Sequence, residues 1–161
     1  MRCDMKKHSI QSLLFYVISA ELIGGLSALL TGSFSAFLET YRQPPLLPPG
    51  GLFPGVWVIL YAVMGYSAYR VCISDALSDN KKAALTVYWI QLAFNFSWSI
   101  VFFRFEWLWG GFGIICALLL LIILMTALFY KADKKATYLN LPYFLWVAFA
   151  AYLNFATASL N

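Results

Sequence analysis

The chain has 161 residues, of which 62% are hydrophobic, 19% aromatic and only 11% charged, and its mean hydropathy is +0.76. These values exclude an ordinary soluble domain and indicate a polytopic membrane protein that forms one compact unit over residues 1–161. The net charge of +4 does not point to nucleic acid as a partner, because the basic residues gather at the ends of apolar segments.

Five apolar segments are each about as long as a helix that crosses a bilayer. The expected spans are residues 9–31, 52–71, 83–103, 108–130 and 141–160. The sequence therefore predicts an all-α polytopic membrane protein, a five-transmembrane-helix bundle. The first apolar run is much longer than the core of a cleavable signal peptide, so we interpret it as an uncleaved anchor.

Basic residues are distributed unequally over the two sides that these spans define. Nine fall on the side of the amino terminus: Arg2, Lys6, Lys7, Arg70, Lys81, Lys82, Lys131, Lys134 and Lys135. Only Arg42 and Arg104 fall on the other side. The positive-inside rule then predicts a cytoplasmic amino terminus, an external carboxyl terminus and an external loop at 32–51, and a bacterial plasma membrane fits this arrangement.

The first span combines a face of small residues with one acidic residue. Ala20, Gly24 and Ala28 recur every four residues, a spacing that lets another helix approach closely. Glu21 is an intramembrane carboxyl group and is interpreted as a proton site or a cation partner. A protonated Glu21 that is hydrogen-bonded to a neighbouring helix explains the same residue, and the sequence leaves these alternatives open.

Five of the six prolines lie between Pro44 and Pro54, in and after the first loop. Proline fixes φ and removes backbone donors, so this stretch is expected to be stiff and not helical. It is interpreted as a rigid turn into the second span, as a lid over the external mouth of the bundle, or as both.

The third span carries a polar and aromatic stripe. Helical spacing places five residues on one side: Tyr88, Gln91, Asn95, Trp98 and Phe102. Lipid offers no hydrogen-bond partner to an amide, so this face is expected to point into the bundle. There the amides either join helices or, together with the aromatic rings, line a ligand pocket.

The fifth span repeats this pattern. Its face of Tyr143, Trp146, Ala150 and Asn154 is expected to turn inward, where Asn154 can meet Asn95 across the core. The fourth span is uniformly aliphatic and is expected to face lipid or a second subunit. No metal site is expected, because His8 is the only histidine and the three cysteines are scattered.

Three separated motifs carry a resemblance to a known family. They are PP-G-x-x-F-x-x-V-W-x-x-L-Y-x-x-M-G over 48–65, Q-L-x-x-N-x-x-W over 91–98 and P-Y-x-x-W-x-x-F-A-x-x-L-N over 142–154. In these the chain resembles the TspO/MBR family, the tryptophan-rich sensory proteins whose mitochondrial members are the translocator protein or peripheral benzodiazepine receptor. The resemblance runs from about residue 32 to residue 154 and more weakly into the first span.

The resemblance implies five transmembrane helices, often in a homodimer within membrane lipid, and a pocket under the first loop. It implies that this pocket binds porphyrins, either protoporphyrin IX or a haem-type tetrapyrrole, and isoquinoline-carboxamide or benzodiazepine-type drugs, with no intrinsic cofactor. The family's pocket positions correspond here to Pro48, Trp57, Tyr61, Asn95, Trp98, Trp146 and Ala150.

The first loop departs from the family pattern. Most relatives have a Trp-Tyr pair where this chain has Phe37 and Leu38, and Lys-Pro-x-Trp where it has Gln43, Pro44, Pro45 and Leu46. Two aromatic groups and a cation expected near the lid are therefore replaced, and Tyr41 is a candidate to substitute for one ring.

The leading functional hypothesis is a membrane receptor or scavenger for tetrapyrroles, since indole and phenol walls suit a flat apolar macrocycle. The resemblance also implies light-dependent porphyrin breakdown, for which Trp57 and Trp146 are the candidate catalytic, photo-oxidative residues. The alternatives are a transporter of tetrapyrroles or similar amphiphiles, and a structural or regulatory partner protein with a lipid-filled pocket.

Overall fold

The computed structural model describes residues 10–49 and 51–161. Arg2, Lys6, Lys7 and His8, to which the sequence analysis assigned positions, lie outside the described residues. Within the described ranges the secondary structure is helical and contains no strand, as the all-α prediction requires.

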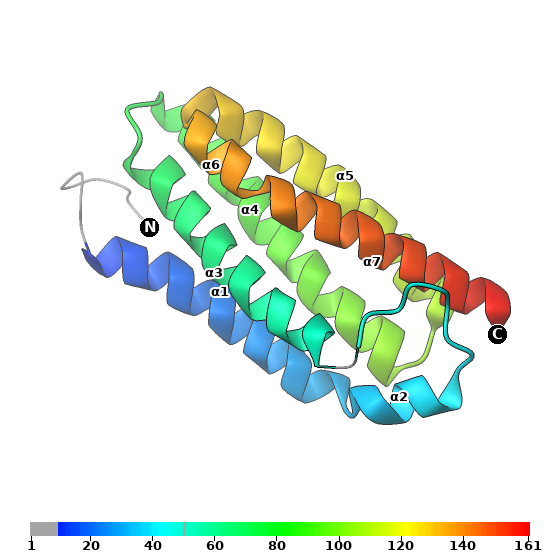
Figure 1. Ribbon diagram of the computed structural model, residues 1–161. Coiled ribbons are helices and arrows are strands. Elements are labelled where there is room, and N and C mark those ends of the chain that lie inside the picture. Colours follow the sequence, from blue (N-terminus) through cyan, green and yellow to red (C-terminus); the bar gives the residue numbers. More distant parts are fainter. Residues whose placement is uncertain (1–9, 50) are drawn as a thin grey trace.

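Long apolar helices lie side by side and form an elongated bundle (Figure 1). They are α1 (Ile10–Thr31), α3 (Leu52–Ile73), α4 (Ser78–Ser99), α5 (Leu108–Ala132) and α7 (Leu141–Leu160). The π-helix η1 (Ile100–Arg104) extends α4, and the short α6 (Lys134–Leu139) leads into α7. The resulting five helices are long and apolar enough to cross a membrane, which confirms the predicted five-helix bundle.

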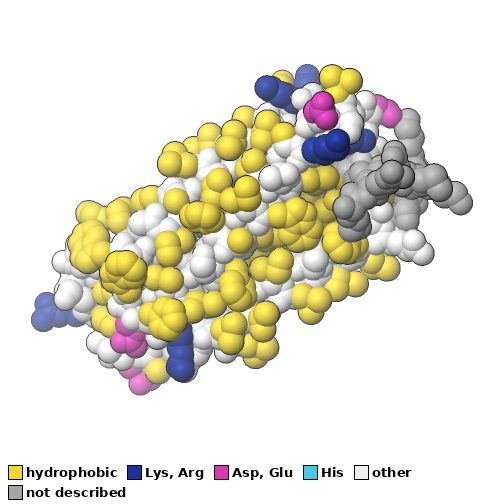
Figure 2. Space-filling view, turned by 180° about the vertical axis from the view of Figure 1, so that it is seen from behind, with side chains coloured by type: hydrophobic (Ala, Val, Ile, Leu, Met, Phe, Trp, Pro, Cys, Tyr) yellow, Lys and Arg dark blue, Asp and Glu magenta, His cyan; other side chains and the backbone are white. Residues whose placement is uncertain are grey.

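The bundle has two ends that differ in charge. The basic end holds the 73–78 and 132–141 connections, and the loop end holds residues 32–49, residues 100–108 and the end of α7 (Figure 1). Figure 2 shows the charged side chains at the two ends and hydrophobic side chains over the surface between them. On α5, Leu120, Ile123 and Leu124 are exposed, as expected of a helix that faces lipid or a second subunit.

Two glycines allow α1 and α3 to pack closely. A Cβ atom added at Gly65 of α3 would lie 2.6 Å from the backbone oxygen of Tyr16 and 2.7 Å from Cα of Val17. A Cβ atom at Gly24 of α1 would lie 2.3 Å from the ring of Tyr61. The small-residue face expected on the first span is confirmed at Gly24, because no larger residue fits there without displacing that ring.

The predicted stripe on α4 and η1 faces the interior. All five of its members are buried: Tyr88, Gln91, Asn95, Trp98 and Phe102. Gln91 has 0% of its surface exposed and Asn95 has 1%. A bilayer cannot satisfy these polar groups, so their burial inside the bundle determines the rotation of α4 about its axis.

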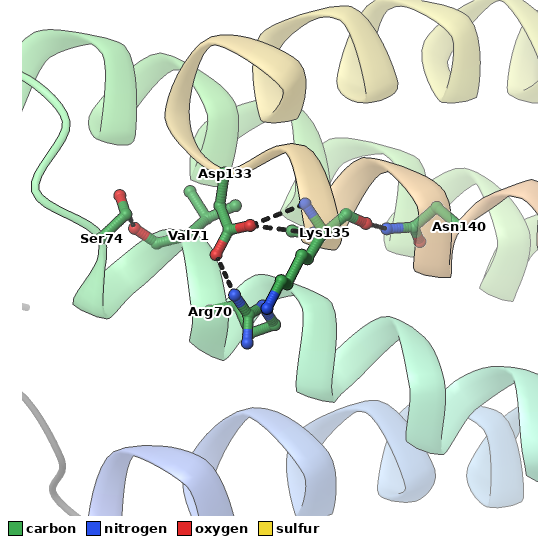
Figure 3. Close-up of polar contacts among 7 residues, drawn as sticks. Arg70, Val71, Ser74, Asp133, Lys135 and Asn140 are labelled. Carbon is green, nitrogen blue, oxygen red and sulfur yellow. Dashed lines mark hydrogen bonds and ion pairs between the residues drawn. The ribbon is translucent and has the colours of Figure 1, made fainter.

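Polar contacts hold the helices together at the basic end (Figure 3). Arg70 of α3 forms an ion pair with Asp133, at 2.7 Å between Nη2 and Oδ2. The other carboxylate oxygen of Asp133 accepts hydrogen bonds from the first backbone N–H groups of α6, which makes this residue an N-cap. Asn140 donates to the hydroxyl of Ser67 at 2.7 Å. The α5–α6–α7 connection is therefore attached to α3.

The first loop contains a helix that the sequence analysis did not predict, α2 (Phe34–Thr40). The hydroxyl of Ser33 caps it by accepting a hydrogen bond from the backbone N–H of Ala36. Gly32, with φ of +88°, makes the turn between α1 and α2 in a region that favours glycine. Residues 41–49 are not helical, as the prolines predicted.

Candidate functional site

A chain of hydrogen bonds connects three helices in the middle of the bundle. The hydroxyl of Tyr61 on α3 donates to Oδ1 of Asn95 on α4 at 2.8 Å. The amide nitrogen of Asn95 donates to the hydroxyl of Tyr143 on α7 at 2.9 Å. That hydroxyl donates in turn to Oε1 of Gln91 at 2.7 Å. The amides therefore join helices, one of the two roles expected of them.

A second buried hydrogen bond lies closer to the loop end. The indole N–H of Trp98 on α4 donates to Oδ1 of Asn154 on α7 at 2.8 Å, and the amide of Asn154 donates to the backbone oxygen of Ala150. The expectation that Asn95 and Asn154 meet is therefore wrong, because each amide is bonded to an aromatic side chain of another helix. Aromatic groups reach farther than amides, so they bridge the helices.

A cavity of about 260 Å³ lies next to this network, between α1, α3 and α4. The residues that line it include Trp57, Tyr61, Asn95 and Trp98. The indole rings of Trp57 and Trp98 have centroids 5.7 Å apart, and the rings of Trp57 and Tyr61 have centroids 5.8 Å apart. The walls of the cavity are aromatic, and Asn95 adds a polar edge. This composition is typical of a site for a flat apolar ligand.

The seven residues expected to form the pocket fall into two groups. Trp57, Tyr61, Asn95 and Trp98 line the cavity, as stated above, whereas Pro48, Trp146 and Ala150 do not. Pro48 lies half-buried in the first loop, and Ala150 is buried on α7.

Trp146 lies one ring away from the cavity wall. Its ring centroid is 5.6 Å from that of Phe53, which lines the cavity and lies 6.3 Å from Trp57. The indole nitrogen of Trp146 is buried and has no hydrogen-bond partner among the described residues. The structure therefore separates the two tryptophans that the sequence analysis named as candidate catalytic residues.

Helix α1 contributes more to the cavity than the sequence analysis expected. Glu21, Ser27 and Thr31 line it together with small residues of the same helix. The Ser27 hydroxyl is hydrogen-bonded to Ser99 of α4, to which Thr31 also donates at 3.3 Å. The sequence places hydroxyl side chains at a similar depth in the first and third spans. This pattern could have predicted the contact, because such groups form hydrogen bonds between membrane helices.

The first loop lies at the loop end of the bundle (Figure 1), and its first residues, Gly32 and Phe34, line the cavity. Phe37 of α2 is buried, with its ring centroid 5.3 Å from that of Phe102 and 4.9 Å from that of Phe103. The hydroxyl of Tyr41 donates to Glu106 at 2.9 Å. Partial burial and this carboxylate raise the pKa of Tyr41 above its usual value.

The rest of the loop is attached to the end of α7. The backbone N–H of Arg42 donates to Oδ1 of Asn161 at 2.9 Å, and the amide of Asn161 donates back to the oxygen of Arg42 at 3.1 Å. Tyr152 donates to the backbone oxygen of Pro45 at 3.3 Å. These bonds hold residues 41–45 as a cover, which agrees with the lid interpretation of the proline-rich stretch.

Replacing Asn161 with alanine is expected to loosen this cover, because the substitution removes both hydrogen bonds to Arg42, worth about 1–2 kcal/mol together. Hydrogen–deuterium exchange should become faster by about tenfold at the Arg42 amide and stay unchanged in the middle of α3. Ser159→Ala, a neighbouring exposed position, is the control. Unchanged exchange at Arg42 in Asn161→Ala would show that other contacts hold the loop.

The residues of the site offer no arrangement suited to a metal ion. Within 10–49 and 51–161, no group of three or more His, Cys, Asp or Glu side chains is close enough together to hold one. The polar and aromatic groups available in the cavity are indole and phenol rings, an amide, hydroxyl groups and one carboxyl group.

The sequence profile of the TspO/MBR family matches residues 14–160, nearly the whole chain. The tryptophan-rich protein TspO of Chlorobaculum tepidum is 35% identical over 79% of this chain and 80% of its own length. Protein CrtK of Rhodobacter capsulatus is 32% identical over 91% of this chain and 90% of its own. The translocator protein of Bos taurus is 28% identical over 87% and 84%, respectively. With its five apolar helices and aromatic cavity, the chain belongs to the TspO/MBR family.

Proposed function

We propose that this protein is a membrane receptor or scavenger for tetrapyrroles of the porphyrin type. The observation that carries the proposal is the cavity in which Trp57 and Trp98 stand 5.7 Å apart beside Asn95. A porphyrin is flat and apolar, so it gains most from stacking on indole rings, and the amide can orient a polar edge. Isoquinoline-carboxamide and benzodiazepine-type drugs share this flat aromatic character and are proposed as ligands of the same site.

The unequal charge of the two ends supports an orientation in the membrane. Arg70, Lys81, Lys82, Lys131, Lys134 and Lys135 lie at the basic end, against Arg42 and Arg104 at the loop end. We propose that the basic end faces the cytoplasm of a bacterial cell and that the loop end, with its cover, faces outward. The homodimer stays a prediction from the family resemblance.

Titration of the purified protein with protoporphyrin IX tests the receptor proposal. We expect quenching of tryptophan fluorescence and a shifted Soret band on binding. Trp57→Ala should weaken binding by about tenfold or more, because it removes one of the two indole rings from the wall. Trp109→Ala is the matched control, since that indole is 55% exposed at the loop end. A wild-type protein that leaves both signals unchanged would contradict the proposal.

We propose light-dependent breakdown of the porphyrin as an extension of binding. Trp57 lines the cavity and therefore would stand beside a bound macrocycle, whereas Phe53 separates Trp146 from it. The measurement is the loss of the Soret band under illumination, compared between wild type, Trp57→Phe and Trp146→Phe. If the bound porphyrin bleaches in all three proteins at the rate of free porphyrin, the protein binds porphyrin but does not break it down.

Transport is a second candidate, favoured by Glu21, which lines the cavity at a depth where charged residues often mark pathways. Uptake of protoporphyrin into proteoliposomes distinguishes it from binding alone. A receptor should saturate at one porphyrin per site, whereas a transporter should load the vesicle lumen beyond that amount.

A further inference from the structure

The carboxyl group of Glu21 lies in the cavity without a positive partner. No Lys, Arg or His among the described residues forms an ion pair with it. Ionisation of a carboxyl group inside a membrane protein requires a cation as partner, and the described residues do not supply one to Glu21.

The aromatic rings of the cavity favour a positive charge as well. The face of an indole or phenol ring carries negative charge density and attracts an ammonium group within about 6 Å. Trp57, Trp98 and Tyr61 line the same cavity as Glu21. Carboxylate and aromatic faces together form the combination by which proteins recognise organic cations.

The cavity is open on the side that faces lipid. Among its lining residues, Gly25 and Ala28 of α1 and Pro54 and Val58 of α3 are exposed, and Val58 has 59% of its surface exposed. A Cβ atom added at Gly25 would meet no atom within 4 Å. On the opposite side, the hydrogen bond between Ser27 and Ser99 joins α1 to α4. The opening therefore lies between α1 and α3, on a surface that acyl chains would surround in a bilayer.

We propose that this cavity binds lipophilic amines in their protonated form, with Glu21 as the counter-ion and the aromatic rings as walls. Such molecules dissolve in the bilayer and reach the opening between α1 and α3 by lateral diffusion. The flat apolar part lies against Trp57 and Trp98, and the charged nitrogen lies toward Glu21. This ligand class goes beyond tetrapyrroles and does not depend on their binding.

A pair of matched probes tests the proposal on the full chain in nanodiscs of uncharged lipid at neutral pH. The probes are 9-aminoacridine, which is protonated under these conditions, and acridine, which is neutral and has the same fused rings. We expect wild type to bind 9-aminoacridine about tenfold more tightly than acridine, a difference that corresponds to 1.4 kcal/mol. In Glu21→Gln the two dyes should bind equally, with acridine affinity unchanged.

Glu39→Gln is the control, because this carboxylate is exposed on α2 and lies outside the residues that line the cavity. It should retain the tenfold preference. Equal affinity for the two dyes in wild type, or a preference that persists in Glu21→Gln, overturns the proposal. Protoporphyrin IX titrated in parallel separates the two proposals: amine binding without porphyrin binding rejects the tetrapyrrole receptor alone, and the reverse rejects this inference alone.

A measurement on wild type keeps the test valid if Glu21→Gln fails to fold. Dicyclohexylcarbodiimide is an apolar reagent that modifies carboxyl groups inside membrane proteins, and mass spectrometry of the α1 peptide reports its attachment to Glu21. We expect 9-aminoacridine to slow this reaction at concentrations at which acridine does not. Equal rates with and without 9-aminoacridine would show that the amine does not lie at Glu21.

Discussion

Gly65→Ala is expected to destabilise the bundle by about 3 kcal/mol, the upper part of the range for overpacked interiors. The added Cβ atom would lie 2.6 Å from the backbone oxygen of Tyr16 and 2.7 Å from Cα of Val17. Both atoms belong to the backbone of α1 and cannot rotate away, so the two helices have to separate. Unfolding in mixed micelles with increasing denaturing detergent, followed by circular dichroism, measures the loss.

The same helix supplies a matched control for this substitution. Gly55 lies in the first turn of α3, and a Cβ atom added there would meet no atom within 4 Å. Gly55→Ala should therefore be as stable as wild type or slightly more stable, since alanine favours a helix. If Gly65→Ala and Gly55→Ala unfold at the same detergent fraction, close packing of α1 on α3 does not hold the bundle together.

The second large effect is expected for Asn95→Leu, with a loss of about 2–4 kcal/mol. Leucine has similar size but leaves the hydroxyl of Tyr61 without its acceptor and that of Tyr143 without its donor, both in a buried setting. Lipid and the apolar interior provide no replacement. The same detergent titration measures the change, and loss of the polar edge should also weaken protoporphyrin binding.

A double-mutant cycle with Tyr61→Phe tests whether the loss comes from the hydrogen bond. In the Tyr61→Phe background the hydroxyl is already absent, so Asn95→Leu should cost at least 0.5 kcal/mol less than it does in wild type, the smallest coupling typical of residues in contact. Additive losses would mean that the cost of Asn95→Leu arises from packing alone. Tyr143→Phe in place of Tyr61→Phe examines the second bond in the same way.

Periodicity was sufficient to predict the five long apolar helices and the inward face of the third. The stripe from Tyr88 to Phe102 is buried as predicted because an amide in a membrane span has one energetically acceptable position, inside the bundle. Small residues on α1 predicted close contact in the same way, and Gly24 under the ring of Tyr61 confirms it. These predictions depend on the free energy of exposing each side chain to lipid, which is set by the chemistry of that residue alone.

Partners across the bundle could not be predicted in this way. Asn154 bonds the indole of Trp98 and not Asn95, because the contact depends on the length of each side chain and on the relative shift of α4 and α7. Helix α2 was missed for a related reason. Its seven residues are short for a helix that has to form alone, and Phe37 stabilises it only through packing on Phe102 and Phe103.

The sequence by itself determined the number of crossings, the inward faces and the charge difference between the ends, because hydropathy and charge act on each residue independently of its partners. The tertiary structure decided which aromatic residues share a cavity. Trp57 and Trp98 line it while Trp146 lies behind Phe53, and Glu21 of α1 enters it. Such a grouping depends on the distances between α1, α3, α4 and α7, which close packing at Gly65 and the hydrogen bonds of Asn95 establish only in the folded bundle.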